Sequence, residues 1–246
     1  HVRSRRQRQM CIRDRYIQEN GTLKNKLGIE EYDDLNKAEK DIGFVKLIDV
    51  NKAFKKRYDA EFFKTIHKHI FGDIFDWAGE FRSVPIEKIE VVIPGLSLHY
   101  SEPEDIPEDL DSALDVLNNT SWQGKNIEEI ASEFTQGLAR IWRVHPFRDG
   151  NTRTTLAFAD IYAKEHGFPM DISMLLDQLS RVTDENGKIR RYSIRDKFVL
   201  AALDKKDYPE PEHLTALIKT AIQKGISQEK QRQGNILGDN EEDEVR

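Results

Sequence analysis

Apolar residues recur at every third or fourth position along most of the chain, and this spacing predicts a largely helical protein. The clearest stretch is 126–143, where Asn126 can cap a helix and Glu129 can complete a capping box. We expect further helices over residues 53–71, 104–118, 152–166, 171–182, 191–204 and 211–224.

Residues 81–100 break the helical pattern. They are rich in β-branched residues, and Pro94-Gly95 is a turn signal, so we expect a short β-hairpin there. A lone two-stranded hairpin is marginal in water unless it packs on something, which indicates a purpose other than stability. The predicted fold class is therefore all-α, a helical bundle with one short β-hairpin.

Composition excludes several classes of protein. With 246 residues, of which 38% are hydrophobic and 33% charged, the chain can bury a core and is not wholly disordered. No apolar run approaches the ~18 residues that span a bilayer, so we expect no integral membrane protein. The net charge of -6 provides no electrostatic reason to expect a nucleic-acid partner. The single cysteine, Cys11, excludes a disulfide framework and a cysteine-based zinc site.

The two ends of the chain are polar and strongly charged. Residues 1–15 hold six arginines and one aspartate, without the apolar run of a secretory signal. We expect them to be a disordered leader outside the fold rather than an arm that binds nucleic acid or membrane. Residues 223–246 end in an acidic run and are expected to form a solvated tail. The folded domain is then 16–222, and the cytoplasm is the default compartment.

The loop HPFRDGNTR, residues 145–153, lies between two predicted helices and is suited to binding an anion. Pro146 disfavours helical geometry at His145, so the imidazole projects from a turn. Gly150 frees the backbone to face a ligand. The N-terminus of the following helix then offers unpaired N–H donors and a positive dipole end, a combination that binds phosphate.

Four side chains make this loop a candidate active site for phosphoryl or nucleotidyl transfer. His145 titrates near neutrality and can accept the proton of an attacking hydroxyl. Asp149 offers Mg²⁺ a hard oxygen ligand, and Arg153 is a forked cation suited to phosphate oxygens. Phe147 is an apolar residue in a polar loop and is expected to anchor the loop to the core. The chain contains neither GxxxxGK[ST] nor GxGxxG, so a P-loop or a Rossmann site does not explain phosphate binding.

HPFRDGNTR resembles the signature of the Fic family, His-Pro-Phe-x-(Asp/Glu)-Gly-Asn-(Gly/Lys)-Arg, at eight of its nine positions. The segment IFDWAGEFRS, Ile74–Ser83, is similar to the family's second hallmark, which leads into a hairpin called the flap. The resemblance covers about Tyr16 to residue 222. It implies a helical fold with the motif on a loop between two central helices and the flap, here about 81–100, over that loop. Most characterised members transfer AMP from ATP to a Ser, Thr or Tyr hydroxyl of a target protein, using Mg²⁺ and releasing pyrophosphate.

The resemblance also implies a role for each site residue. His145 would be the base on the target hydroxyl, Asp149 the Mg²⁺ ligand and Phe147 the loop anchor. ATP would be bound by Gly150, Asn151, Thr152 and Arg153 of the motif and by Pro85, Ile86, Glu87 and Lys88 of the flap. The flap would pair its main chain with a segment of the target protein. The chain would then be a protein adenylyltransferase with ATP as co-substrate and Mg²⁺ as cofactor.

Two positions depart from the family pattern and keep other activities open. Thr152 stands where Gly accompanies AMP transfer and Lys accompanies the kinase-like Doc branch, and its small uncharged side chain favours AMP transfer. Leu156 stands where many AMP-transferring members carry a second arginine for the γ-phosphate, a contact worth on the order of 1.5–3 kcal/mol. The alternatives are a Doc-like phosphotransferase, transfer of another nucleotidyl or a phosphocholine group, and a nucleotide-binding module without efficient turnover.

Many relatives are held inactive by a helix that bears [Ser/Thr]-x-x-x-Glu-[Gly/Asn], and this sequence contains no match. The nearest segment, Val182–Gly187, has Thr183 only two residues before Glu185. Either a separate small antitoxin supplies the glutamate, which would make the chain the toxin of a bacterial pair, or inhibition of this type is absent. Relatives also include secreted effectors, so the cytoplasm is not the only compartment to consider.

Other histidines and tryptophans are expected to be structural. His67 and His69 lie two residues apart on a predicted helix and point to different faces, so ordinary helix positions are favoured over a metal site. Trp77, Trp122 and Trp142 are expected to pack in or beside the core rather than to stack on a base.

Overall fold

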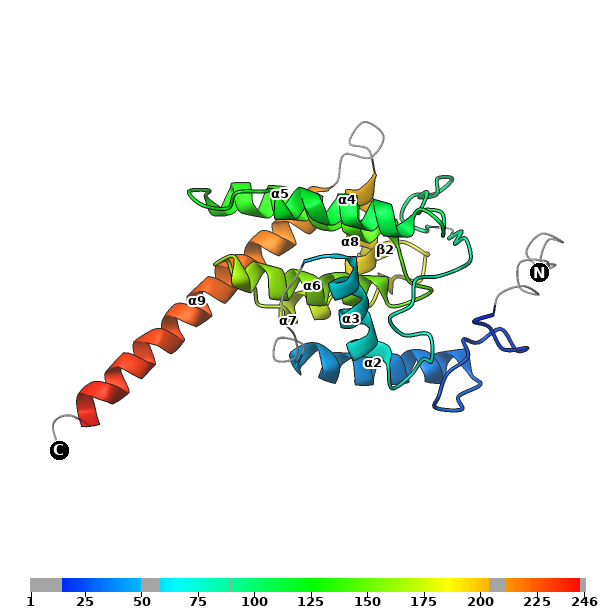
Figure 1. The fold of residues 1–246 in the computed structure, drawn as a ribbon, viewed down its shortest axis with the longest axis horizontal. Coiled ribbons are helices and arrows are strands. Elements are labelled where there is room, and N and C mark those ends of the chain that lie inside the picture. Colours follow the sequence, from blue (N-terminus) through cyan, green and yellow to red (C-terminus); the bar gives the residue numbers. More distant parts are fainter. Residues whose placement is uncertain (1–14, 50–57, 89, 204–210, 244–246) are drawn as a thin grey trace.

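In the computed structural model, which describes residues 15–49, 58–88, 90–203 and 211–243, the chain forms a helical bundle (Figure 1). The helices are α2 (Tyr32–Asp49), α3 (Ala60–Phe71), α4 (Ile106–Asn118), α5 (Ile127–Val144), α6 (Asn151–Glu165), the single turn α7 (Ser173–Leu176), α8 (Ile194–Ala202) and α9 (Glu212–Asp243). The predicted all-α fold class is confirmed.

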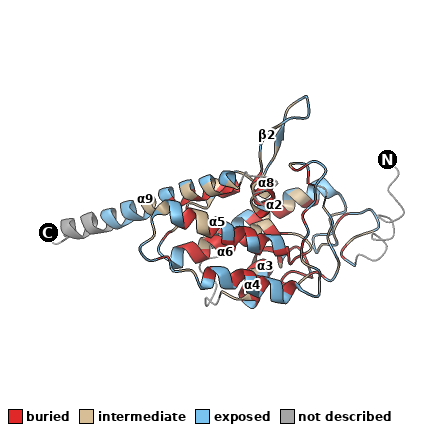
Figure 2. Ribbon diagram, turned by 90° about the horizontal axis from the view of Figure 1, so that it is seen from above, coloured by how far each residue is buried: buried red, intermediate tan, exposed pale blue. Residues whose placement is uncertain are grey.

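Helix α5 is central to the packing of the bundle. It packs against α4, α6, α8 and α9, while α3 lies against α6 and α2 covers both (Figures 1 and 2). The apolar stripe that predicted this helix is the face that it buries, with Phe134, Leu138 and Trp142 fully enclosed. The predicted capping box is present, because Asn126 accepts from the first turn and Glu129 accepts from the Asn126 N–H at 2.8 Å. Local capping and burial of one face therefore specify α5 together.

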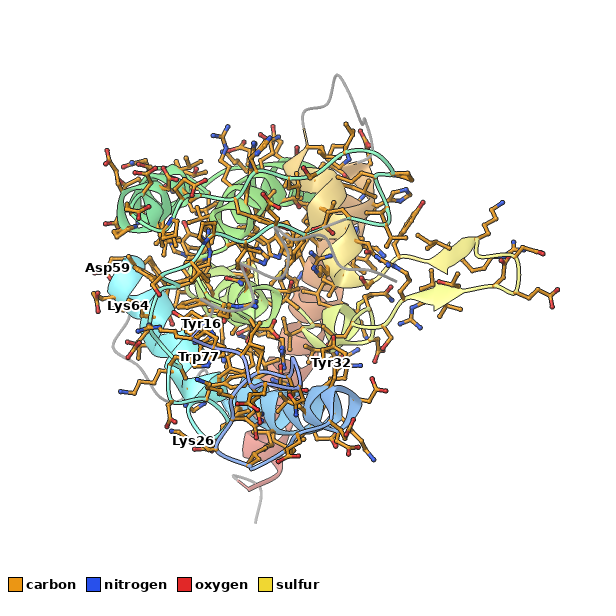
Figure 3. The ribbon with its side chains drawn as sticks, turned by 90° about the vertical axis from the view of Figure 1, so that its right-hand side faces the viewer. Tyr16, Lys26, Tyr32, Asp59, Lys64 and Trp77 are labelled. Atoms are coloured by element: carbon orange, nitrogen blue, oxygen red, sulfur yellow. The ribbon has the colours of Figure 1, made fainter. Side chains whose placement is uncertain are left out.

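The segment before α2 packs onto the turn that follows α3. Tyr16 is 2% exposed, and its ring meets the edge of the Trp77 ring at a centroid distance of 5.4 Å (Figure 3). Lys26 lies 3.5 Å from Asp76 on the same turn. These contacts attach the beginning of the described chain to the body of the fold.

The hairpin predicted over 81–100 is wrong, because the described residues of this segment pair with no strand; Ile89 lies outside them. Its backbone and side chains bond to other segments instead. The Arg82 N–H donates to the Pro146 carbonyl at 2.9 Å, and the Arg82 guanidinium donates to the carbonyls of His145 and Ser101. The segment therefore lies over the motif loop as an irregular chain, as the flap was expected to lie, but without a ladder of its own.

A two-stranded antiparallel sheet forms elsewhere, from β1 (Val182–Thr183) and β2 (Ile189–Arg191), and projects from the body (Figure 2). Asp184 starts the connecting turn by accepting from the N–H groups of Asn186 and Lys188 at 3.1 and 2.8 Å. This turn replaces the end of the helix predicted over 171–182 and the start of the one predicted over 191–204.

Helix boundaries differ from prediction in three further places. Helix α2 was not predicted. The helix predicted over 53–71 begins at Ala60, where Asp59 accepts from the Phe62 N–H at 2.9 Å, and the structure does not describe residues 53–57. The helix predicted over 211–224 continues as α9 to Asp243, so most of the expected tail is helical; the expected leader is undescribed up to residue 14.

Among the described residues, no helix combines the length and the hydropathy that a membrane span requires.

Candidate active site

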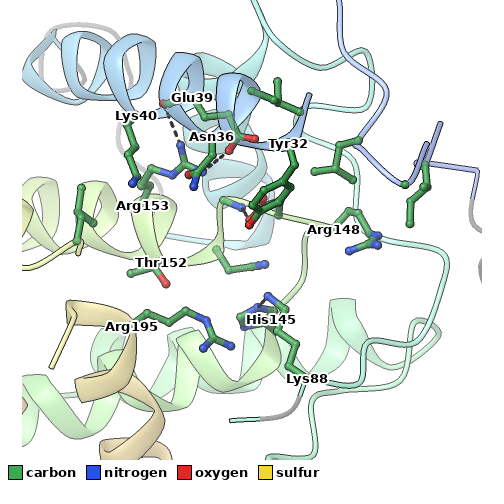
Figure 4. Close-up of a pocket in the computed structure, with 18 residues that line it drawn as sticks. Tyr32, Asn36, Glu39, Lys40, Lys88, His145, Arg148, Thr152, Arg153 and Arg195 are labelled. Atoms are coloured by element: carbon green, nitrogen blue, oxygen red, sulfur yellow. Dashed lines mark hydrogen bonds and ion pairs between the residues drawn. The ribbon is translucent and has the colours of Figure 1, made fainter. Parts of the chain in front are cut away.

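The motif loop opens into a pocket of about 450 Å³ between α2, the start of α6 and residue 88 (Figure 4). A volume of this size is typical of small-molecule sites. The motif residues that line it are His145, Arg148, Asp149, Gly150, Asn151, Thr152 and Arg153. Of the four flap residues predicted to border a nucleotide, Lys88 lines the pocket. Pro85 and Glu87 are exposed, and Ile86 packs against the core.

His145 ends α5 in a left-handed conformation, with φ 52° and ψ 55°, and is 2% exposed. Its Nδ1 lies 3.3 Å from the Trp142 carbonyl, which can only accept, so the proton of a neutral ring is on Nδ1. The lone pair of Nε2 then lies 3.2 Å from the Lys88 ammonium. Burial, and next to it the charges of Lys88 and Arg195, lower the pKa of His145 well below its ordinary value. The imidazole is therefore neutral at pH 7 and can act as a base.

Lys88 is half-buried, and burial lowers its pKa to about 8, against the opposing attraction of Asp149. At pH 7 it remains mostly an ammonium. A cation in this position disfavours protonation of His145 and attracts an anionic ligand to the pocket. The prediction that Lys88 borders the site therefore has a direct geometric basis.

The motif loop is attached to the core by aromatic packing and an amide bridge. Phe147 is fully buried and stacks on the His67 ring at a centroid distance of 3.8 Å. The Asn151 side chain accepts from the Phe147 N–H at 2.9 Å and donates to the Phe147 carbonyl at 2.8 Å. The Asn151 side chain is therefore occupied within the loop. A phosphate could be bound by the main-chain N–H of Asn151 but not by its side chain.

His67 of α3 joins the two sequence hallmarks. Its Nδ1 accepts from the Gly79 N–H at 2.8 Å, so Nε2 carries the proton and donates to the Asp149 carbonyl at 3.1 Å. Burial lowers the pKa of His67 to about 3, which keeps the ring neutral. The sequence analysis assigned His67 to an ordinary helix position and missed this contact. Its place on the buried stripe of Phe63 and Phe71, at steps of four, was the available signal.

Gly150 allows α6 to begin beside the pocket. Its φ is 78°, and a Cβ at this position would lie 2.3 Å from the Phe71 ring. The Gly150 N–H donates to the Asp149 carboxylate at 2.7 Å, which orients that carboxylate next to the helix N-terminus. The loop thus places an anion-attracting helix end and a carboxylate side by side.

Arg153 pairs with Glu39 of α2, a residue that the sequence analysis did not identify. Its guanidinium donates to the Glu39 carbonyl at 2.9 Å and to the Glu39 carboxylate at 2.6 Å (Figure 4). Glu39 does not fit the inhibitory pattern [Ser/Thr]-x-x-x-Glu-[Gly/Asn], because Leu35 stands four residues before it and Lys40 follows it. The carboxylate that meets the motif arginine therefore comes from this chain's own helix.

The two carboxyl groups of the pocket ionise differently. Burial, followed by repulsion from Asp149, raises the pKa of Glu39 to about 7, although Arg153 opposes the rise. Burial also disfavours the ionised form of Asp149, but Arg153 and Lys88 outweigh it and lower the pKa of Asp149. Asp149 is thus the carboxylate available to a cation at neutral pH, and Glu39 is the one that takes up a proton first.

Comparison with known proteins identifies the family. A family model described as Fic/DOC family matches residues 57–163. Residues 57–163, which include the motif loop, are therefore a Fic domain. The chain is 27% identical over 154 residues to the protein adenylyltransferase VbhT of Bartonella schoenbuchensis, a match that covers 62% of this chain and 31% of VbhT. It is 28% identical over 184 residues to a protein adenylyltransferase of Bartonella henselae, covering 68% of this chain and 34% of that protein. The chain thus spans about a third of the length of these two relatives.

Solved structures of Fic domains share the fold. The N-terminal FIC domain of Bep8 from Bartonella sp. 1-1C superposes with a TM-score of 0.65 at 23% identity, covering 84% of this chain and 93% of that one. The BepC protein from Bartonella tribocorum, whose structure holds AMPPNP, superposes with a TM-score of 0.61 at 19% identity, covering 84% and 95%. At these identities the likeness establishes the fold alone.

The two departures from the Fic signature have different structural consequences. Thr152 accepts from the indole N–H of the buried Trp142 at 3.0 Å, so its hydroxyl satisfies a donor that a glycine would leave unpaired. Leu156 is fully buried in the core. This Fic domain therefore directs no second cation from α6 into the pocket.

The donors of the pocket fit a divalent cation that is bound together with phosphate. Asp149 supplies an ionised carboxylate, and the described residues contain no cluster of three His, Cys, Asp or Glu that could hold a metal ion by themselves. Mg²⁺ commonly binds through one carboxylate, with phosphate oxygens and water as its other ligands. Asp149 is the residue that would hold it here.

Proposed function

We propose that this Fic domain transfers AMP from ATP to a hydroxyl group of a target protein. One observation carries the proposal: the neutral, buried His145 directs its Nε2 into the same pocket as the N-terminus of α6 and the Asp149 carboxylate. The names of the two adenylyltransferase relatives and the AMPPNP bound to BepC support the choice of ATP and of AMP transfer.

The chemistry divides among the residues of this chain. His145 Nε2 takes the hydroxyl proton while the hydroxyl oxygen bonds to the α-phosphorus of ATP. The bond from that phosphorus to the oxygen shared with the β-phosphate breaks, and pyrophosphate leaves with the electron pair. The α6 N-terminus and Lys88 stabilise the negative charge of the phosphates. Mg²⁺ on Asp149 would neutralise further phosphate charge when bound.

The test is labelling of proteins by the purified chain with Mg²⁺ and ATP labelled at the α-phosphate, in a bacterial lysate. His145→Asn is the matched control, because asparagine tolerates the left-handed conformation of this position but cannot act as the base. We expect label on protein from the wild type only. Equal label from the control would contradict the proposal, and label from γ-labelled ATP instead would favour the Doc-like phosphotransferase.

A second candidate function is nucleotide binding with little turnover. It is favoured by one observation, that Arg153 already donates to Glu39 and no arginine stands at Leu156. Calorimetry that detects ATP binding, combined with no labelling of any protein by the wild type, would support this candidate against AMP transfer.

We further propose that residues 81–100 contact the target protein. Val91 and Leu96 support this, since they are 57% and 44% exposed on the segment that covers His145. A role as the toxin of a toxin–antitoxin pair is also a proposal. It predicts a short neighbouring open reading frame that encodes Ser-x-x-x-Glu-Gly.

A further inference from the structure

Arg195 brings a guanidinium into the pocket from outside the motif. It is the second residue of α8, whose N-terminus is capped by Ser193 and Asp196. Its side chain lines the pocket and is 32% exposed, and Figure 4 shows it directed into the pocket from the side opposite Arg153. Neither the Fic signature nor the second hallmark includes this residue.

Glu90 holds this guanidinium in one orientation. The two terminal nitrogens of Arg195 each lie 2.6 Å from a different oxygen of the Glu90 carboxylate. Glu90 is 1% exposed and also accepts from the Tyr100 hydroxyl at 2.9 Å. A bidentate pair of this kind fixes the rotamer of the arginine, so a ligand would not have to order it.

The fixed guanidinium retains donors for a ligand. A guanidinium carries five N–H groups, and Glu90 is its only hydrogen-bond acceptor among the described residues. Two N–H groups serve Glu90, which leaves three on a side chain that is partly open to the pocket. Arg153, by contrast, already donates twice to Glu39.

Two series of side-chain contacts place Arg195 near the start of α6 and near His145. Its guanidinium lies 6.0 Å from the centre of the Trp142 ring, and the Trp142 indole donates to Thr152 at the start of α6. On the other side, Glu90 holds Tyr100, whose ring lies 4.2 Å from that of His145. The charge of Arg195 also contributes to the lowered pKa of His145. A phosphate between His145 and the α6 N-terminus would therefore meet this guanidinium.

We propose that Arg195 is a phosphate-binding residue of this pocket, held in place by Glu90. It supplies from α8 a second arginine that α6 lacks at Leu156. This inference rests on the proposed function only for the identity of the ligand, a nucleoside triphosphate. The recognition itself is by a positioned, forked cation of an anionic phosphate group.

The test compares ligands with and without phosphate. In the double variant Glu90→Gln/Arg195→Gln, two amides replace the ion pair, so no buried charge is left unpaired and Tyr100 keeps an acceptor. Calorimetry with ATP and Mg²⁺ should show at least tenfold weaker binding than for the wild type. Adenosine affinity, measured by NMR titration, should change less than twofold. Equal losses for ATP and adenosine, or no loss for ATP, would overturn the proposal.

The single variant Glu90→Gln is the matched control. It keeps the guanidinium, and the glutamine amide oxygen can still accept from it, so ATP binding should stay within about threefold of the wild type. A loss equal to that of the double variant would attribute the effect to the ion pair and overturn the proposal. Failure of the two proposals is distinguishable. A wild type that binds ATP through Arg195 but labels no protein refutes AMP transfer alone, and a double variant with unchanged ATP affinity in an active enzyme refutes the role of Arg195 alone.

Discussion

Arg153 of α6 and Glu39 of α2 form a two-point contact at one wall of the pocket. The guanidinium donates to the carbonyl and to the carboxylate of Glu39, and its centre lies 4.5 Å from the Phe71 ring centroid. The pair is largely buried, with the Glu39 side chain 6% exposed. An arginine expected to bind phosphate is therefore partly neutralised by the protein itself, and the charge state of Glu39 should control how strongly a nucleotide binds.

We expect Glu39→Gln to tighten ATP binding at pH 8. The amide can still accept from Arg153 but removes a negative charge from beside the phosphates, which should raise affinity roughly threefold to tenfold. The pKa of Glu39 is raised to about 7, so the wild-type carboxyl is ionised at pH 8 and mostly protonated at pH 6. The advantage of the variant should therefore disappear at pH 6. Calorimetry should give the ratio of the wild-type Kd for ATP to that of the variant at each pH. The titration of ATP itself affects both proteins equally and cancels in this ratio. The same ratio at pH 6 and pH 8 would contradict the prediction.

Substitution of Lys88 should move the pH dependence of transfer. His145 must be neutral to act as a base, so activity falls as pH drops through its pKa, which the charge of Lys88 helps to keep low. In Lys88→Gln that pKa should rise, and the acid limb of kcat/KM should shift to higher pH. Lys88→Arg keeps the charge and should leave the limb in place. An unchanged limb in Lys88→Gln would show that the lysine charge does not act on His145.

His67 should act on activity through the position of Asp149. His67→Gln can still accept from Gly79 and donate to the Asp149 carbonyl, and we expect kcat/KM within a few-fold of the wild type. His67→Phe fills the space but leaves both backbone groups unpaired, at a cost of about 1–3 kcal/mol each in the free energy of unfolding. A displaced motif loop should then lower kcat/KM on the order of a hundredfold. Urea unfolding and transfer kinetics of both variants separate the two effects, and equal activity of the two would refute the positioning role.

Gly150→Ala should damage both stability and nucleotide binding. The new Cβ would lie 2.3 Å from the Phe71 ring in a backbone conformation with φ 78°. We expect a loss of more than about 2 kcal/mol in the free energy of unfolding. Gly187→Ala is the matched control, with φ 77° and no atom within 4 Å of its Cβ, and should cost only about 1 kcal/mol. Equal losses in thermal or urea unfolding would mean that the contact with Phe71 is unimportant.

The exposed face of residues 81–100 should affect the protein substrate and not ATP. Val91→Asp and Leu96→Asp place charges on surface positions of the segment over His145. We expect labelling of target proteins to fall at least several-fold while the Kd for ATP stays unchanged. Val116→Asp, on a similarly exposed position of α4, should leave labelling intact. Normal labelling by both flap variants would argue against target binding at this segment.

The helical fold class and the chemistry of the motif could be predicted from the sequence, because both depend on short-range physics. The capping box of Asn126 and Glu129, the turn at Pro146 and the left-handed Gly150 each involve residues that are close along the chain. Predictions from local patterns were wrong where the chain forms hydrogen bonds with residues that are distant in the sequence. The β-branched residues of 81–100 resembled a hairpin, but Arg82 bonds this segment to the motif loop instead.

The completed pocket was decided only by the tertiary structure. Glu39 is separated from Arg153 by 114 residues, Lys88 from His145 by 57, and Glu90 from Arg195 by 105. No spacing rule connects such pairs, since each forms only when α2, the segment over the loop, and α8 pack around α5 and α6. The sequence by itself therefore determined which groups can do the chemistry. Packing decided which charges surround them, because electrostatic interactions depend on distance in space and on burial rather than on position along the chain.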